Sequence, residues 1–218
     1  MKRILAISII LTAMIPARSQ SPVRFSLHVD PQFAWFHSDD ENVVPNGSIF
    51  HLQAGLQMDY FFAENYAFAL GVAINNLGGN LIYNDSTEFS TKGGPVQVVP
   101  GQNVKQNLQY VDIPVGLKLK TEELGYATFF FQLGFNPMIN INAKGTSDAA
   151  SMDKDDIREN INLFCLGYHA GAGVEYKLGG NTAVIGGIRW TSGLTDVTDN
   201  DRTNVKLNAI SIHLGILF

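Results

Sequence analysis

The sequence predicts an all-β fold, an eight-stranded antiparallel up-and-down transmembrane β-barrel, and three observations support this prediction. Eight segments alternate large apolar residues with small or polar ones, which is the period of a strand with two chemically different faces. The connections alternate between short turns and long polar loops, the layout expected of an outer-membrane barrel. A leader segment precedes the first strand and indicates export.

Composition excludes several classes of protein. The 218 residues fit one domain or one barrel. The formal net charge of -5 offers no basic surface for nucleic acid. The single cysteine, Cys165, excludes an internal disulfide and a cysteine-rich metal site. Charged residues make up 16% of the chain, well below the roughly 25% of an ordinary soluble domain.

The first residues have the pattern of a secretory signal peptide. A basic start precedes an apolar run, Ile4 to Ile15, which is shorter than the roughly 20 residues of a spanning helix. Small residues at Ala17 and Ser19 fit a cleavage site. We therefore expect a cleaved signal peptide over residues 1–20 and a barrel domain over 21–218, with an uncleaved anchor as the alternative.

Each of the eight segments has one register of large apolar residues. In chain order these registers cover Phe25–Trp35, Phe50–Phe62, Phe68–Ile74, Val111–Leu119, Phe129–Ile139, Phe164–Tyr176, Val184–Trp190 and Ile210–Phe218. The opposing faces carry, in the same order, Ser26 and Gln32; Gln53 and Asp59; Ala69 and Ala73; Asp112 and Lys118; Gln132 and Asn136; His169 and Glu175; Arg189 and Thr191; Ser211 and His213. Three large apolar residues fall out of pattern: Phe130, Ile185 and Leu217.

The connections sort into two kinds. Three are short turns, with the sequences AEN, TEELG and GGN. Four are long and polar, covering about 37–48, 84–106, 143–162 and 196–205. Short periplasmic turns and long extracellular loops are typical of outer-membrane barrels, and an even strand count puts both ends of the barrel on the periplasmic side. Within the third loop, DKDDIRENI is expected to form one short helix.

The alternation also indicates which face meets lipid. A soluble, secreted lipocalin-like barrel would place the bulky residues inside around a ligand. The bulky face offers about forty large side chains, whereas an eight-stranded barrel encloses only enough space for side chains to fill. The other face carries too few charges for a water-exposed surface. We therefore expect the bulky face in lipid, the small and polar face in the lumen, and the protein in the cell outer membrane.

Aromatic residues gather near the ends of the predicted strands. Two aromatic belts, one at each membrane interface, are expected of such barrels. The predicted girdle consists of Trp35, Tyr60, Phe62, Tyr66, Tyr126, Tyr176, Trp190 and Phe218.

Two stretches carry a resemblance to a known family. A Tyr-apolar-acid-apolar-Pro run at Tyr110 to Pro114 is followed by a strand rich in glycine and aromatics, and the chain closes on ISIHLGILF. This resembles the PorT-like outer-membrane β-barrel family of Bacteroidota, which implies the same fold and location and, as an open alternative, an accessory role in a type IX-like secretion complex. The final strand, with Leu214, Ile216 and Phe218, resembles the signal read by the barrel-assembly machinery of Gram-negative bacteria.

The lumen face carries balanced charges. They form the predicted lumen charge network: Asp30, Asp59, Asp112, Lys118, Lys120, Glu175, Lys177 and Arg189. Buried charges are rarely left unpaired, so we expect a periplasmic-side cluster of ion pairs and a higher pair between Arg189 and Asp112 or Asp30. The alternative is a proton or ion path. The lumen is too narrow for a solute pore.

We find no catalytic residue set and no metal or cofactor site in the sequence. A lipid A-modifying enzyme would need a serine, a histidine and an acid on the face that meets lipid. Ser211 and His213 share a face, but that face is the lumen and no acid partner is identifiable. The acidic loops lack the calcium-loop spacing, although divalent cations could bridge them to lipopolysaccharide. The expected partners are outer-membrane lipid and lipopolysaccharide, the assembly machinery and, as an alternative, secretion-complex subunits. We expect a non-enzymatic structural or interaction protein.

Overall fold

The computed structural model describes residues 23–199 and 204–218, so the predicted signal peptide lies outside the described residues. The described residues form these elements: β1 (Val23–Ser38), β2 (Val43–Pro45), β3 (Ile49–Ala63), β4 (Tyr66–Tyr83), β5 (Thr87–Thr91), β6 (Gly94–Val98), β7 (Gln102–Asp112), β8 (Val115–Lys120), β9 (Ala127–Ser147), β10 (Met152–Asp156), the 3-10 turn η1 (Arg158–Asn160), β11 (Phe164–Gly179), β12 (Thr182–Gly193) and β13 (Val205–Leu217).

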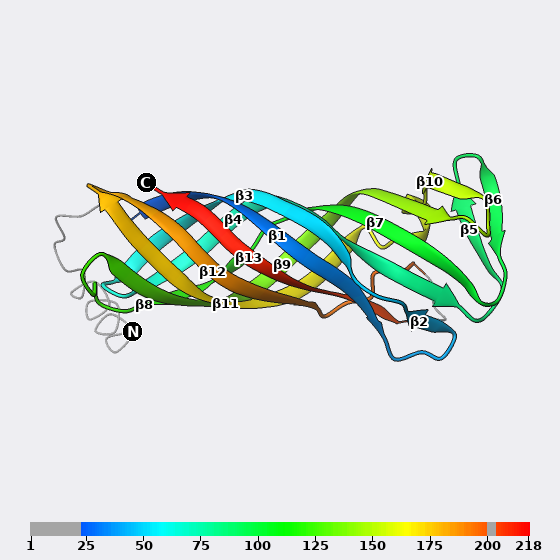
Figure 1. Ribbon diagram of the computed structural model, residues 1–218, viewed down its shortest axis with the longest axis horizontal. Helices are drawn as coiled ribbons and strands as arrows, with labels where there is room; N and C mark the ends of the chain where they lie inside the picture. Colours follow the sequence, from blue (N-terminus) through cyan, green and yellow to red (C-terminus); the bar gives the residue numbers. More distant parts are fainter. Residues whose placement is uncertain (1–22, 200–203) are drawn as a thin grey trace, which may run out of the picture.

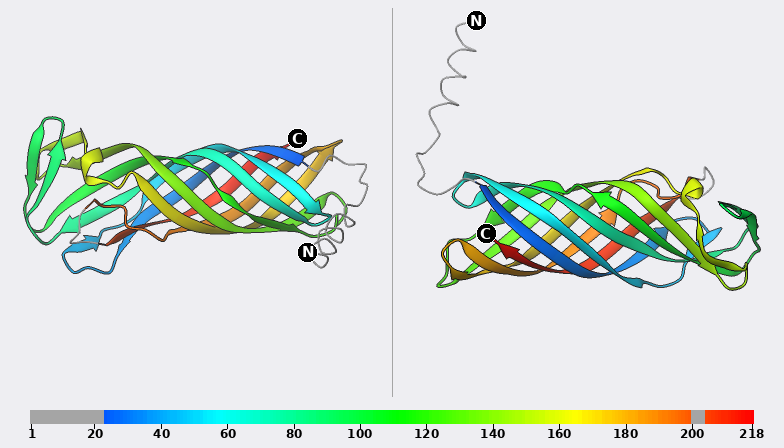
Figure 2. Two further views of the ribbon diagram at one scale, coloured as in Figure 1. Left: turned by 180° about the vertical axis from the view of Figure 1, so that it is seen from behind. Right: turned by 90° about the horizontal axis from the view of Figure 1, so that it is seen from above.

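Eight antiparallel wall strands, with β7 and β8 together counted as one, close into a hydrogen-bonded ring. The order around the ring is β1, β3, β4, β7 with β8, β9, β11, β12 and β13, and β13 pairs back with β1. Figures 1 and 2 show one elongated barrel whose strands are inclined to its long axis. The predicted eight-stranded barrel is confirmed. Among the described helices, none has the length and apolar character needed to span a membrane.

One of the eight wall strands is interrupted at a proline. β7 and β8 both pair with β4 and β9, and the break between them falls at Ile113 and Pro114. The neighbouring strands bridge it, because Ile113 N donates to Pro137 O at 3.0 Å and Gly71 N donates to Pro114 O at 2.9 Å. A Cβ on Gly71 would lie 2.9 Å from the Pro114 ring, so the close approach depends on glycine there. The proline of the Tyr110–Pro114 run therefore marks a break in the wall.

In the half of the barrel with the short turns, the outer face is apolar and the inner face is polar. On β1, Leu27 is 53% exposed whereas its neighbour His28 is 3% exposed. The same alternation continues on β13, where Ile212 and Leu214 are exposed and His213 is buried. A soluble lipocalin-like barrel would show the opposite arrangement, so that alternative is wrong.

In the other half the two faces exchange character. On β7 the inward residues Val104, Leu108 and Tyr110 are buried, whereas the outward Lys105 is exposed and Asn107 is half-buried. Inward apolar residues from several strands and loops form one core: Phe36, Leu77, Leu81, Leu108, Tyr110 and Met138 are among its members. This is the arrangement of a water-soluble protein, so the strands extend beyond the lipid into the extracellular space.

The extracellular end is more ordered than the sequence predicts. β2, β5, β6 and β10 gather at the end opposite the short turns (Figures 1 and 2). The predicted loop at 84–106 contains the β5–β6 hairpin and the start of β7, and the predicted loop at 143–162 contains the end of β9. Because the apolar face switches sides there, the periodicity rule did not recognise these strands. The expected helix in DKDDIRENI is only β10 followed by the single turn η1.

A seam interrupts the wall between β3 and β4. Their ladder runs from Ala63↔Tyr66 to Gln53↔Asn75 and stops there, and β4 next pairs with β2 at Leu81↔Pro45. Residues 46–52 and 76–80 face each other across this interval without a ladder. Single hydrogen bonds hold its two ends, from Asn46 N to Asn80 O at 2.9 Å and from Asn76 Nδ2 to Leu52 O at 2.8 Å.

Candidate functional site: closed lumen and extracellular rim

Ion pairs close the periplasmic half of the lumen. Lys118 Nζ on β8 lies 2.6 Å from Asp59 Oδ2 on β3 and 2.8 Å from Glu175 Oε1 on β11. Lys120 pairs with the same Glu175. All four side chains are almost fully buried. The structure thus brings together four of the predicted network residues into one neutral cluster, two cations with two carboxylates, as burial of charge requires.

An apolar cluster adjoins these ion pairs at the same end. It consists of Phe130, Ala183, Ile185 and Leu217, which include the three large residues that fall out of pattern in the sequence. Lys118 Nζ lies 4.8 Å from the Phe130 ring centroid, a cation–π distance. A Cβ on Gly173 would meet Phe130 Cζ at 2.7 Å, so glycine there makes room for the ring. The three irregular residues are therefore inward-facing members of a plug.

A second buried group surrounds Asp30. His213 Nδ1 lies 2.9 Å from Asp30 Oδ1, His28 Nδ1 lies 3.2 Å from Asp30 Oδ2, and Arg189 contacts the same carboxylate at 3.5 Å. The partner of Arg189 is therefore Asp30, one of the two carboxylates that the sequence offered. The two histidines were not predicted members, although their position on the lumen face of β1 and β13 is visible in the alternation.

His28, Asp30 and His213 each offer a metal-ligating atom within 4.8 Å of the others. The Arg189 guanidinium competes with a metal cation for the same carboxylate. Metal coordination is thus opposed by the local charge, and Asp30 is instead held by hydrogen bonds with His213 and Arg189, with His28 in close contact.

The remaining carboxylate of the lumen, Asp112, is held by amides. Asn136 Nδ2 donates to it at 2.9 Å, Asn75 Nδ2 at 3.1 Å and Gln53 Nε2 at 3.2 Å. A chain of hydrogen bonds joins Asp112 to Asp59 through, in order, Asn136, His169, Gln132 and Gln57. Polar side chains therefore fill the middle of the lumen, and above them lies the apolar extracellular core.

Lys177 is the exception among the predicted network residues. Its side chain is 43% exposed, and its Nζ lies 2.6 Å from Glu123 Oε2 in the turn between β8 and β9. Lys177 is two positions after Glu175 on β11, so it falls on the side of the strand that faces the lumen. It lies at the rim of the barrel, however, where its side chain reaches solvent. The expectation of a lumen position for Lys177 is thus corrected.

Ser211 and His213 do not form a hydrolytic pair. His213 has an acid partner, Asp30, which the sequence did not reveal. Ser211 Oγ, however, donates to the Arg189 carbonyl at 3.4 Å, and all of these side chains are buried in the lumen. An activated serine needs its base within hydrogen-bond reach and a route for the substrate. Neither condition is met by these residues.

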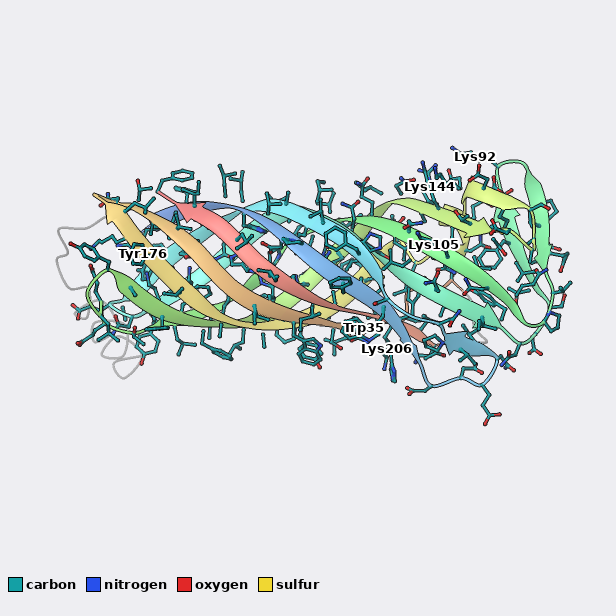
Figure 3. The ribbon with its side chains drawn as sticks, viewed as in Figure 1. Trp35, Lys92, Lys105, Lys144, Tyr176 and Lys206 are labelled. Carbon is teal, nitrogen blue, oxygen red and sulfur yellow. The ribbon has the colours of Figure 1, made fainter. Side chains whose placement is uncertain are left out.

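The girdle residues lie on the outer face. Tyr60, Phe62, Tyr66, Tyr126, Tyr176, Trp190 and Phe218 are exposed, and Trp35 is half-buried. Figure 3 shows Tyr176 near the short-turn end and Trp35 towards the loops, with the apolar wall between them. Tyr168, which sequence reasoning missed, stacks edge-on against Trp190 with 5.3 Å between ring centroids. The assembly-signal residues Leu214, Ile216 and Phe218 also point outward from β13.

Beyond Trp35 the outer face becomes polar and basic. Figure 3 places Lys105, Lys144 and Lys206 on the loop side of Trp35 and Lys92 farther out. Lys92 Nζ lies 3.0 Å from Asp156 Oδ2, and Arg158 contacts the same oxygen at 2.8 Å. The hydrogen bonds from Arg158 and Lys92 hold the pKa of Asp156 well below its usual range. This exposed group links the β5–β6 hairpin to β10 and η1.

Proteins similar to this chain are found among solved structures, and one protein family matches it. None of the curated proteins matches the chain. Among solved structures it is similar to Neisserial surface protein A, with 13% identity, a TM-score of 0.46 and coverage of 88% of this chain and 95% of that one. It is also similar to Ail of Yersinia pestis, with 12% identity, a TM-score of 0.44 and coverage of 91% of this chain and 100% of that one. OprG of Pseudomonas aeruginosa is similar at 14% identity and a TM-score of 0.44, with coverage of 89% of this chain and 95% of that one. The outer-membrane protease OmpT of Escherichia coli matches at 7% identity and a TM-score of 0.45, covering 94% of this chain and 99% of that one. The family described as "outer membrane protein beta-barrel domain" matches residues 17–199. The chain therefore belongs to this family of proteins of the cell outer membrane.

Proposed function

We propose that this protein is a closed, non-enzymatic barrel that acts as a surface interaction protein through the extracellular extension of its strands. The observation that carries the proposal is the filled lumen. The apolar cluster at Phe130, the ion pairs of Lys118, the amides around Asp112 and the extracellular core follow one another along the barrel. A lumen packed in this way offers no path for a solute, so the extracellular end is the part available for function.

The extracellular end is built to hold its shape. Asn160 of η1 donates to Ser90 O at 2.9 Å and accepts from Ser90 N at 3.2 Å, which ties the β5–β6 hairpin to η1. Tyr83 and Phe89 pack edge-on with 5.4 Å between ring centroids, which ties the hairpin to β4. A preorganised surface loses less conformational entropy when it binds a partner, so these contacts support a binding role for the hairpin.

The finer proposal is membership of the PorT-like group and an accessory role in a secretion complex. It rests on the Tyr110–Pro114 run, whose proline forms the break in the wall described above. Under this proposal the partner is a protein of the same membrane that contacts the β5–β6 hairpin and β10.

Two experiments test these proposals. Purified protein in planar bilayers is expected to show no steady conductance, and porin-like conductance would contradict the closed barrel. For the partner, a tag between Gly47 and Ser48, in the exposed loop before β3 and outside the β5–β6 hairpin, allows cross-linking and recovery from intact outer membranes. Secretion-complex subunits in fixed proportion would support the accessory role, and recovery of the barrel alone would contradict it.

A matched pair of variants makes the recovery specific. Asn160→Ala removes the tie between η1 and the β5–β6 hairpin and is expected to reduce recovery of the partner. Asn181→Ala changes an exposed asparagine in the short turn before β12, at the opposite end of the barrel, and is expected to leave recovery unchanged. Equal recovery with both variants would place the contact elsewhere.

A further inference from the structure

A groove of about 380 Å³ opens on the outer wall at the seam between β3 and β4. Its polar lining consists of His51, Asn76, Asn107, Gln109, Asn142 and Lys144. They come from β3, β4, β7 and β9, so four wall strands build it. Gln109 Nε2 donates to Asn76 Oδ1 at 2.9 Å, which fixes part of the lining.

The groove lies where the wall changes from apolar to polar. On β4 the outward residues change from Ile74 to Asn76, and on the next wall strand they change from Val115 to Gln109. Figure 3 places Lys105 and Lys144 on the loop side of Trp35, whereas Tyr176 marks the other end of the apolar wall. Tryptophan and tyrosine sit at membrane interfaces. The groove therefore lies at the level of the lipid headgroups of the outer leaflet.

Two lysines on this face have the spacing of an anion clamp. Asn107 pairs with Lys144, and Lys105 pairs with Thr146, so the two lysines are diagonal neighbours on one outward surface. Diagonal neighbours across an antiparallel pair lie about 7–8 Å apart, a separation that two flexible ammonium groups can close around one phosphate. Asp156 is opposite Lys144 in the ladder, but its carboxylate is taken by Lys92 and Arg158.

The rest of the lining suits a sugar. Four amide side chains provide both donors and acceptors, which match the hydroxyl groups of a saccharide. His51 Nε2 is buried in the same wall and has no hydrogen-bond partner among the described residues. His51 has the inward parity of Gln53, so it closes the inner side of the groove. Leu52, on the apolar side, faces outward and is exposed.

We propose that this groove binds the phosphorylated saccharide headgroup of an outer-leaflet glycolipid. The phosphate lies between Lys105 and Lys144, the sugar contacts the amides, and the acyl chains run down the apolar wall past Leu52. This site is separate from the hairpin surface of the proposed function, so either can fail without the other.

The test uses the purified full-length barrel in detergent, titrated with bis-phosphorylated lipid A and followed by native mass spectrometry. Near an anionic surface one lysine contributes about five-fold in affinity, so Lys105→Gln and Lys144→Gln should each weaken binding about five-fold and the double variant about 25-fold. Lys177→Gln, at the periplasmic rim, is the matched control and should leave binding unchanged. Asn107→Asp, which adds a carboxylate beside both lysines, should weaken binding at least as much as one lysine variant.

Three outcomes would overturn the proposal. Equal binding of lipid A from which the phosphates have been removed would show that the headgroup charge is not recognised. An equal loss with Lys177→Gln would show a non-specific charge effect. Displacement of lipid A by inorganic phosphate at the same concentration would show a phosphate site and no lipid site.

Discussion

Phe218 and Phe25 exchange both backbone hydrogen bonds. Phe218 N donates to Phe25 O at 2.9 Å, and Phe25 N donates to Phe218 O at 3.2 Å. These two bonds extend the ladder between β13 and β1 that closes the ring, at the rim where the short turns lie. The side chains of both phenylalanines are exposed on the lipid face. Phe218 therefore contributes both to barrel closure, through its backbone, and to the aromatic belt, through its side chain.

Deletion of Phe218 is expected to destabilise the barrel, whereas Phe218→Leu is not. The deletion removes two backbone hydrogen bonds, each worth about 1 kcal/mol, so we expect a loss of about 2 kcal/mol in the free energy of unfolding. Leucine keeps both bonds and an apolar side chain at the interface. Urea unfolding in lipid vesicles measures both variants. Equal stability of the deletion and the original chain would contradict a closing role for this pair.

Lys118→Met is expected to cost far more stability than Lys177→Met. The first change leaves Asp59 without its cation and Glu175 with only Lys120, and breaking a buried pair in this way costs about 3–5 kcal/mol. The second removes an exposed pair with Glu123, for which about 0–1 kcal/mol is typical. The same unfolding assay compares them. Similar losses for both variants would mean that the lumen cluster is solvated and does not close the barrel.

The change of polarity on the outer face predicts where the lipid ends. Asn103→Cys on β7, an exposed outward position on the loop side of the groove, is expected to react with a water-soluble maleimide in intact outer membranes, whereas Val115→Cys on β8 is expected to be protected by lipid. The native Cys165 is buried and provides the unreactive background. Labelling of both introduced cysteines, or of neither, would show that the membrane boundary lies elsewhere on this wall.

The Asp156 contacts predict a pH dependence of the extracellular end. The folded-state pKa of this carboxyl is lowered by the Arg158 and Lys92 hydrogen bonds. The contacts therefore contribute stability above the ordinary aspartate pKa of about 4, and this contribution is lost as the pH falls through the folded-state value. Carboxyl-carbon NMR should show Asp156 titrating below pH 4, and Arg158→Gln should move the midpoint upward. A midpoint that does not move would contradict the assigned cause.

The sequence by itself determined the fold and the orientation of the membrane-spanning faces. In lipid an apolar outer face and a polar lumen alternate at every residue, so Leu27 and His28 reveal their sides without any tertiary information. The aromatic belt follows from the same rule. The three residues that break the rule, Phe130, Ile185 and Leu217, are also visible in the sequence, but their common role is not.

Only the tertiary structure decided which of these residues meet. A period of two tells on which side of the wall a residue lies, but its height along the barrel depends on strand register and tilt. Asp30 and His213 are 183 positions apart and meet because β1 and β13 close the ring. Lys177 has inward parity but lies at the rim, where its side chain reaches solvent. At Lys105 the wall leaves the lipid, and because the surrounding solvent changes from lipid to water, the apolar face changes sides.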